Sequence, residues 1–391
     1  MTRKWSRRAV LTVGAGAGIS ALTWFATRRV VRKEGPSRES EIKFRDLTGE
    51  EIVLPGPAQR IIDLWTVGTA FAVAAHGSPS RMIAVNDRAH RIFERGLIGR
   101  FHPEVLDIPY DILVGNGAPN IERLAKLNPD LVVDYKQDAR DSSAAMRNVG
   151  LRVARYTELE GGIRRTIAAL LLMYGQMIGD TARAEHIIEV MEETTARLNA
   201  LQSVPQVARP SVLNVMPLGG RFHASGGGPR GIYSDFIYSA GGINAAAALP
   251  GLSVASVEQI AAWDPDVILI FQSEGADPAL IYDHPILGGG KAASARRVYV
   301  LPIGANNWGS MGPDEFLSQI WLAELLYPDR LESMLREDMR RAYAAIFDRT
   351  LSDDDIDGVL RTDLNAGSAG YARLLRGASN TSQKGIAAPS R

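Results

Sequence analysis

Cysteine is absent from this 391-residue chain, and its absence removes several kinds of site at once. Without thiols there are no disulfides, thiolate zinc sites, iron–sulfur clusters or cysteine nucleophiles, and no N-terminal cysteine can carry a lipid. Histidine is scarce too, with six residues and no H-E-x-x-H spacing. A His-rich loop of the kind a zinc binder would use is also missing. We therefore expect no metal site and no cofactor.

Net charge is the next thing the chain lacks, since 44 basic residues balance 44 acidic ones. The balance is uneven along the chain, because residues 1–35 hold eight basic side chains and one acidic one. The rest has 36 basic and 43 acidic residues, a net charge of −7. Proteins that bind nucleic acid generally neutralise phosphates with clustered Lys and Arg. Nucleic acid is therefore not an expected partner.

Two patterns that could indicate catalysis or calcium binding are incomplete. Residues 251–255 begin like the nucleophile elbow of a hydrolase, but the last glycine is missing. Asp353, Asp355 and Asp357 begin like a calcium loop, but Leu364 stands where the bidentate glutamate is needed. An enzyme is not expected.

The N-terminal region has the layout of a targeting segment. Basic residues precede an uncharged stretch over residues 9–26, and a second basic group follows. Arg7-Arg8 with the residues around them resembles a twin-arginine (Tat) export motif, and the glycine-rich run at 14–18 suits that pathway. Because 18 uncharged residues lie at the lower edge of what spans a bilayer, an uncleaved anchor is the alternative. Residues 1–35 are thus predicted to be a Tat-type signal peptide or an N-terminal membrane anchor, with a periplasmic body.

A helix-to-strand unit occurs twice in the body, at residues 120–135 and 256–271. Each copy starts with an N-cap residue, Asn120 or Ser256, and continues into an amphipathic helix. A Pro-Asp pair then ends the helix, because proline disfavours helical geometry in the residue before it. A β-branched apolar run follows, as in a parallel strand buried on both faces. The repeat predicts two similar α/β lobes.

Further apolar runs predict the remaining strands, at 60–64, 82–85 and 151–154 in the first half and at 212–215 and 297–301 in the second. Residues 163–201 read as almost continuous helix, interrupted only at Gly179-Asp180. An αα-hairpin is possible there, but a single crossing between lobes fits the repeat better. The predicted fold is α/β, with two similar Rossmann-like lobes joined by a long rigid helix. Its expected parts are an N-terminal lobe (42–160), an inter-lobe helix (161–202), a C-terminal lobe (208–330), a helical extension (331–376) and a disordered tail (377–391).

Ligands of open α/β sheets bind at the carboxyl ends of the strands, so the residues just after each strand are the candidates. They are rich in aromatic, cationic and amide side chains, which suits a large, flat, partly anionic guest. In the first half they are Trp65, Arg88, His90, Arg91, Lys136 and Gln137. In the second half they are Arg221, His223, Arg230, Tyr233, Gln272, Asn307 and Trp308. The alternative for the segment around Arg221 is a hairpin turn that leads to a core helix.

In the order and spacing of its motifs, the chain resembles class III periplasmic binding proteins, from about Lys43 to Arg330. The matching motifs lie at 54–62, 119–122, 128–132, 240–244, 256–258 and 321–328. The resemblance implies a solute-binding component of an ABC importer, with one rigid inter-lobe helix and small closure. It also implies that Glu122 and Glu258 dock onto arginines of the membrane permease. A simpler role is also open, because a glutamate in the first turn complements the helix dipole.

The ligand implied by this resemblance is a metal chelate, and we expect an iron(III) siderophore. Cobalamin or heme is the alternative, followed by a bare metal ion or an oxyanion. The expected partners are the permease subunits and the chelate. The protein is expected to be a monomer that meets the membrane only through the permease or an uncleaved N-terminal anchor.

Overall fold

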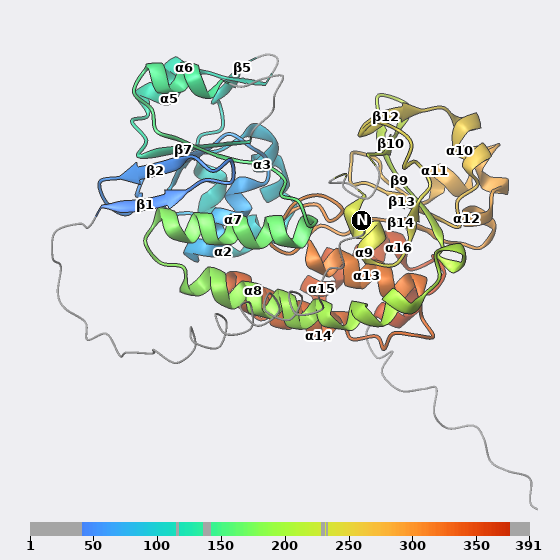
Figure 1. Ribbon diagram of the computed structural model, residues 1–391. Coiled ribbons are helices and arrows are strands. Elements are labelled where there is room, and N and C mark those ends of the chain that lie inside the picture. The colour runs from blue at the N-terminus through green and yellow to red at the C-terminus, as the bar shows by residue number, and fades with distance from the viewer. Residues whose placement is uncertain (1–40, 115–116, 136–141, 228–230, 232–233, 376–391) are drawn as a thin grey trace, which may run out of the picture. The chain divides into compact units, whose positions relative to one another are not determined.

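The computed structural model describes residues 41–375, apart from 115–116, 136–141, 228–230 and 232–233 (Figure 1). The signal or anchor predicted at 1–35 and the tail predicted at 377–391 lie outside the described residues. The described part opens with an antiparallel hairpin of β1 (Ile42–Arg45) and β2 (Glu51–Leu54) that packs against a later helix, α7. None of its helices is long and apolar enough to cross a membrane.

The first lobe is built on a parallel sheet of strand order β4-β3-β7-β8. Its strands are β3 (Ile61–Asp63), β4 (Met82–Ala84), β7 (Leu131–Tyr135) and β8 (Val153–Tyr156), as the sequence predicts. Ile61 and Val133 face a core cluster that includes α2, whereas Ile62 and Val132 face another that includes α5 and α6. Because both faces are covered, these strands read as continuous apolar runs.

The helices of this lobe fall between its strands. They are α2 (Gly68–His76), α3 (Asp87–Phe93), α4 (Leu97–Phe101), η1 (Pro103–Asp107), α5 (Ile121–Lys126) and α6 (Ser143–Asn148). A short hairpin of β5 (Leu113–Val114) and β6 (Ala118–Pro119) precedes α5.

The second lobe has a mixed sheet of order β12-β10-β9-β13-β14, with β11 also paired to β9. The predicted strands β9 (Ser211–Leu218), β13 (Val267–Ile270) and β14 (Val298–Val300) are parallel. The strands β10 (Arg221–Ser225) and β12 (Leu252–Ala255) are antiparallel additions, while β11 (Ile243–Asn244) runs parallel to β9. Its helices are α9 (Asp235–Ser239), α10 (Val257–Trp263), α11 (Ala279–Tyr282), η6 (Leu287–Gly289) and α12 (Lys291–Ser294).

The repeated unit found in the sequence is repeated in the structure. The side chain of Asn120 accepts the backbone N–H of Arg123 at the start of α5, and that of Ser256 accepts Gln259 N–H at the start of α10. In both copies a residue of left-handed geometry follows the helix and stands directly before the proline, with φ of 47° at Asn128 and 40° at Asp264. The prediction of two similar α/β lobes is confirmed.

The aspartate after each of these prolines has a further shared role that the sequence did not reveal. Asp130 accepts the backbone N–H groups of Gln59 and Arg60, and Asp266 accepts that of Ser211. Each aspartate therefore fixes the start of a neighbouring strand in its own lobe.

A helical crossing between the lobes is present, but the prediction that residues 161–202 form one continuous helix is corrected. Residues 163–203 form α7 (Ile163–Met177), α8 (Ala182–Thr195) and the 3₁₀ helix η3 (Ala196–Ser203), and α7 packs against α8. The break lies where the sequence shows Gly179-Asp180, because Gly179 adopts a φ of 74° that turns the chain back. The αα-hairpin alternative is thus confirmed, and α8 contacts both α2 of the first lobe and α13 of the second.

The chain ends in helices that join the two lobes to α8. They are α13 (Phe316–Leu326), α14 (Leu335–Phe347), α15 (Asp353–Leu360), α16 (Thr362–Asn365) and η7 (Tyr371–Leu374). Every residue of α13 is buried, and its apolar side chains belong to a core cluster that also contains residues of both lobes. Arg197 of η3 binds both Glu324 of α13 and Asp338 of α14.

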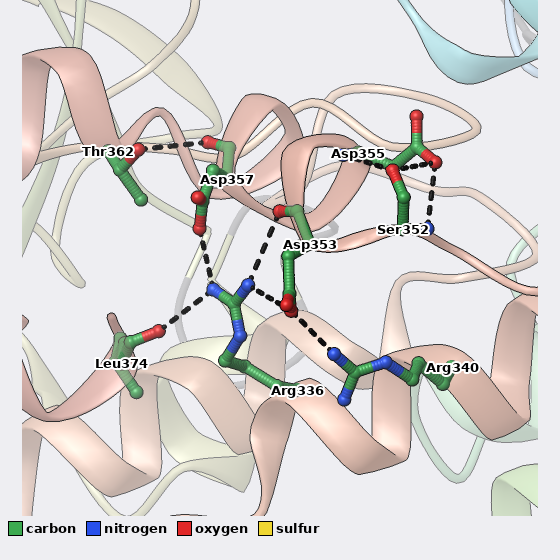
Figure 2. A network of polar contacts seen from close by, with 8 residues as sticks. All are labelled: Arg336, Arg340, Ser352, Asp353, Asp355, Asp357, Thr362 and Leu374. Atoms are coloured by element: carbon green, nitrogen blue, oxygen red, sulfur yellow. Dashed lines mark hydrogen bonds and ion pairs between the residues drawn. The ribbon is translucent and has the colours of Figure 1, made fainter. Parts of the chain in front are cut away.

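The three aspartates that suggested an incomplete calcium loop are held by protein groups (Figure 2). Asp355 forms a capping box with Ser352 at the start of α15. Asp353 pairs with Arg336 at 2.8 Å and Arg340 at 2.5 Å, and Arg336 also reaches Asp357 at 2.6 Å. Asp353 and Asp357 therefore fasten α15 to α14.

Residues 353–365 also contact both lobes. Arg100 of α4 pairs with Asp355 at 2.5 Å, and Ile303 N–H donates to Val359 O at 3.0 Å. Beside the outermost strand β14, the Asn365 side chain accepts Val300 N–H at 2.8 Å and donates to Val300 O at 2.9 Å.

Candidate functional site

Two aromatic side chains lie at the carboxyl ends of the first-lobe strands, where the sequence predicts the ligand. Trp65 follows β3 and is half-buried, and its ring centroid lies 5.0 Å from that of Tyr135, the last residue of β7. Tyr135 lies 5.3 Å from the buried ring of Tyr156, and its hydroxyl donates to Glu158 at 2.8 Å. Trp65 and Tyr135 form what we call the aromatic shelf.

Asp63 lies at the base of this shelf, fully buried at the end of β3. Its Oδ1 accepts the backbone N–H of Trp65 at 2.9 Å, and its Oδ2 accepts the hydroxyl of Tyr174 from α7. Burial raises the pKa of Asp63 to about 7, although both hydrogen bonds oppose the shift. Burial likewise raises the pKa of Tyr174 well above its ordinary value.

The start of α2 is shaped to make room for Asp63. A Cβ atom at Gly68 would lie 1.9 Å from Asp63 Oδ2, so only glycine fits at this point of the helix. The sequence contained a signal for this group, because the strand predicted at 60–64 is expected to be buried and carries one charged residue, Asp63, after its first position. Asp63 is not among the predicted site residues.

Three of the predicted cations of the first lobe, Arg88, His90 and Arg91, lie on α3, and they differ in exposure. Arg88 is exposed, and Arg91 is exposed and pairs with Asp87 at 2.9 Å. His90 is buried, with Nε2 donating to Leu106 O at 2.9 Å and its ring 4.2 Å from that of Tyr110. His90 therefore packs within the first lobe here, and its role as a ligand contact stays a prediction.

In the second lobe, Arg221 and His223 belong to strand β10 and not to a loop. The chain turns at Gly219 and Gly220, both with positive φ, so the hairpin alternative is confirmed. Arg221 pairs with Leu218 at the carboxyl end of β9 and is exposed, whereas His223 pairs with Met216 further along. Arg221 thus lies at the expected edge of the sheet.

Gln272 follows β13 at this same edge and is held by two groups of the protein. Its amide donates to Leu301 O at 2.7 Å, and its side-chain oxygen accepts a guanidinium N–H of Arg361 at 2.9 Å. Arg361 comes from the C-terminal helices, 89 positions further along, so no local pattern could have placed it here.

Asn307 is half-buried, and Trp308 is fully buried. The indole N–H of Trp308 donates to Asp314 Oδ2 at 3.0 Å, and the hydroxyl of Tyr343 donates to the same oxygen at 2.5 Å. Trp308 is therefore packed in the core of this structure, and its role as a ligand contact stays a prediction. Lys136, Gln137, Arg230 and Tyr233 lie outside the described residues.

The two predicted docking glutamates lie in the first turns of α5 and α10, and their surroundings differ. Both are exposed, as expected. Glu122 pairs with Lys126 one turn later, at 2.6 Å. Hydrogen bonds from its own backbone N–H and from Ser256 lower the pKa of the Glu258 carboxyl.

Two further observations concern the kind of ligand and its place. Within the described parts of residues 41–375, no three His, Asp or Glu side chains are grouped so as to hold a metal ion. A cavity of about 350 Å³ lies beside α10 and α12, lined by Ile260, Asp264, Ile286 and Lys291 among others. It adjoins the residues before β13, which is the opposite edge of the sheet from Gln272, so we do not assign the ligand to it.

Comparison with known proteins identifies the family of the chain. The sequence model of the family described as "Periplasmic binding protein" matches residues 104–303. This chain belongs to the periplasmic binding protein family. Proteins of this family bind solutes and not resident cofactors.

Among curated proteins, the chain is similar to the molybdate-binding protein MolA of Haemophilus influenzae. The two are 33% identical over 115 residues, 28% of this chain and 32% of MolA. The chain therefore spans about a third of the length of this curated relative.

Solved structures show the same fold over nearly their whole length. A periplasmic solute binding protein from Veillonella parvula is 23% identical with a TM-score of 0.72, covering 84% of this chain and 99% of that one. MolA bound to molybdate is 18% identical with a TM-score of 0.67, covering 79% and 99%. CeuE of Helicobacter pylori in complex with Ni-His is 20% identical with a TM-score of 0.65, covering 82% and 99%.

Proposed function

We propose that this protein is the periplasmic solute-binding component of an ABC importer, which captures its ligand and delivers it to the membrane permease. The observation that carries the proposal is the family match over residues 104–303, on a fold of two lobes with one repeated helix-to-strand unit. In each lobe the unit exposes a glutamate, Glu122 or Glu258, at an equivalent position. Two matching acidic points suit a permease that receives both lobes.

For the ligand we propose an iron(III) siderophore. The aromatic shelf offers ring faces at the expected edge, and Arg88 and Arg221 add exposed cations. A chelate of this kind spreads its negative charge over a broad surface, which cation–π contacts, aromatic faces and charge-assisted hydrogen bonds can share. Among the described residues no side chains are grouped to hold a metal ion, which fits a ligand whose own donor atoms coordinate the iron.

An oxyanion is the second candidate. It is favoured by the similarity to MolA, which is named as a molybdate-binding protein. A small oxyanion would rely on converging N–H and O–H donors and would gain little from the rings of Trp65 and Tyr135. The two ligands therefore make different demands on the shelf.

The test is a titration panel of iron(III) tris-catecholate and hydroxamate siderophores, heme, cobalamin, zinc and molybdate, followed by tryptophan fluorescence. We expect a ferric siderophore to bind with a dissociation constant on the order of micromolar or tighter. Quenching should be largely lost in Trp65→Phe and kept in Trp263→Phe, whose tryptophan lies on α10. A response to molybdate alone would select the second candidate, and a response to heme or cobalamin alone would replace both.

We also propose that residues 1–35 direct export by the Tat pathway. The support is the Arg7-Arg8 pair ahead of an uncharged, glycine-rich stretch. A net charge of −7 for the remainder agrees with a body that has no nucleic-acid partner. We propose that this body acts as a monomer.

A further inference from the structure

Asp63 ties the aromatic shelf to the interior of the first lobe. Its two oxygens have different partners, the backbone of Trp65 on one side and the hydroxyl of Tyr174 on the other. Tyr174 belongs to α7, which packs on α2 and the β1–β2 hairpin. A movement of the Asp63 carboxyl therefore reaches Trp65 through one hydrogen bond.

The other half of the shelf is fixed independently. Tyr135 contacts Trp65 on one side and Tyr156 on the other, and its hydroxyl is held by Glu158. The relative position of the two rings thus depends on how Asp63 holds the Trp65 segment.

Among the residues that the structure describes, no cation faces Asp63. The titratable groups that face it there are Tyr174 of α7, Tyr156 of β8 and Asp134 of β7, and none of the three can carry a positive charge. α2 contributes Gly68 and Thr69, which are uncharged. Ionised Asp63 would therefore be a buried, unpaired charge, which the fold can relieve by loosening its contacts and admitting water.

We propose that Asp63 is a positioning residue of the ligand site, and that its neutral form holds the aromatic shelf in the arrangement that binds the ligand. The inference rests on the proposed function, because the shelf has a role only if a ligand lies on it. An anionic chelate on the shelf would further disfavour the ionised carboxylate by like-charge repulsion. Ligand capture and proton uptake are then coupled at this residue.

The first experiment uses the protein without ligand. Fluorescence is recorded from pH 5 to 8.5, and the difference between the native protein and Trp65→Phe isolates Trp65 from Trp308, whose neighbour Asp314 is also a buried carboxyl. We expect this difference to change with a midpoint at about pH 7, the value to which burial raises the pKa of Asp63.

Asp63→Asn is the matched variant, because its amide oxygen can still accept Trp65 N–H and the side chain cannot titrate. Its NH2 group replaces the protonated oxygen of neutral Asp63 and would donate to the Tyr174 oxygen, which reverses the hydrogen bond that Tyr174 donates to the carboxylate. The Trp65 transition should vanish in Asp63→Asn. In a second variant, Tyr174→Phe, the transition should move to higher pH, because the hydroxyl lowers the pKa of Asp63. A Trp65 signal that does not change with pH, or that changes equally in Asp63→Asn, would overturn the inference.

The second experiment measures binding of an iron(III) tris-catecholate siderophore and of molybdate over the same pH range. For whichever probe binds, affinity should fall by up to about tenfold per pH unit above 7 in the native protein and stay flat in Asp63→Asn. An equal fall in both proteins contradicts the coupling. If neither probe binds at any pH while the Trp65 transition is intact, the ligand proposed above is contradicted. The same result would still support the inference that Asp63 positions Trp65.

Discussion

At the scale of single residues, Tyr174 joins two groups whose protonation affects stability in opposite directions. Its hydroxyl donates to Asp63, and its carbonyl accepts Nε2–H of His76 at 2.9 Å. Burial raises the pKa of Asp63 to about 7 and lowers that of His76 to about 4. The stability due to neutral Asp63 is present at low pH and is lost as pH rises through about 7. That due to neutral His76 is present above pH 6.5 and is lost as pH falls toward 4.

We expect acid to destabilise the fold measurably through His76. A pKa lowered from 6.5 to about 4 corresponds to at most about 3 kcal/mol lost between pH 6.5 and 4. His76→Gln keeps a donor for the Tyr174 carbonyl and should remove this part of the pH dependence. Urea unfolding at pH 7.5 and pH 4.5 measures it, and an unchanged pH dependence in the variant would exclude His76 as its source.

Residue identity and position in the sequence singled out Trp65 of the aromatic shelf but not Tyr135. Trp65 was predicted because it follows a clear strand, and a tryptophan after a parallel strand is a good candidate for a ligand contact. Trp308 satisfied the same rule but is buried, because Asp314 and Tyr343 form an internal network with it. Tyr343 is 35 positions away from Trp308, so this network is set by tertiary packing and has no local pattern.

At the scale of elements, α5 and α10 are built alike but carry different charges. Position 126 is lysine on α5, and the equivalent position 262 on α10 is alanine, exposed to solvent. Lys126 therefore competes with any outside cation for Glu122, whereas α10 places no cation at the equivalent position beside Glu258.

We expect this difference to appear in permease docking. Lys126→Ala should strengthen binding of the protein to its permease in nanodiscs by about twofold, the effect of one exposed helical ion pair. The reciprocal change, Ala262→Lys, should weaken it by a similar factor. Glu122→Arg and Glu258→Arg should each abolish uptake with ligand affinity nearly unchanged. Normal uptake with both charges reversed would refute docking through these helices.

Element by element, the repeat was the most predictable part of the fold, because caps and Pro-Asp stops are local signals. The inter-lobe segment was mispredicted for a physical reason. A hairpin of two packed helices and one long helix have the same apolar content, and only the left-handed Gly179 separates them. The strand β12 was missed because it pairs non-locally with β10, whereas β10 pairs with β9 through the tight hairpin that the sequence offered as an alternative.

At the scale of the whole molecule, the C-terminal helices connect parts that the sequence suggested were separate. Asp355 of α15 is bound to Arg100 in the first lobe, while Val359 and Arg361 are bound to Ile303 and Gln272 in the second. The sequence predicted a helical extension over residues 331–376. Its contacts could not be predicted, because each joins residues far apart in the chain.

We expect Arg100→Ala to loosen this connection. Arg100 is mostly exposed but its partner is nearly buried, so the loss of stability should be modest, about 1 kcal/mol. The more specific result is faster hydrogen exchange in residues 353–361, measured by mass spectrometry. Arg95→Ala, at an exposed position on the same lobe, is the control. Equal exchange in both variants would show that the pair does not hold α15.

Asn365 has a consequence for how the molecule behaves among copies of itself. The outermost strand of a sheet offers free N–H and C=O groups, which a strand from another chain can use to extend the sheet and begin aggregation. Here the Asn365 amide occupies both backbone groups of Val300 in β14, in the way a neighbouring strand would. Tyr282 and Ser368 hold the backbone groups of Val298 on the same edge, so side chains take the place of a further strand along β14. We therefore expect that the concentrated protein does not grow by strand addition there.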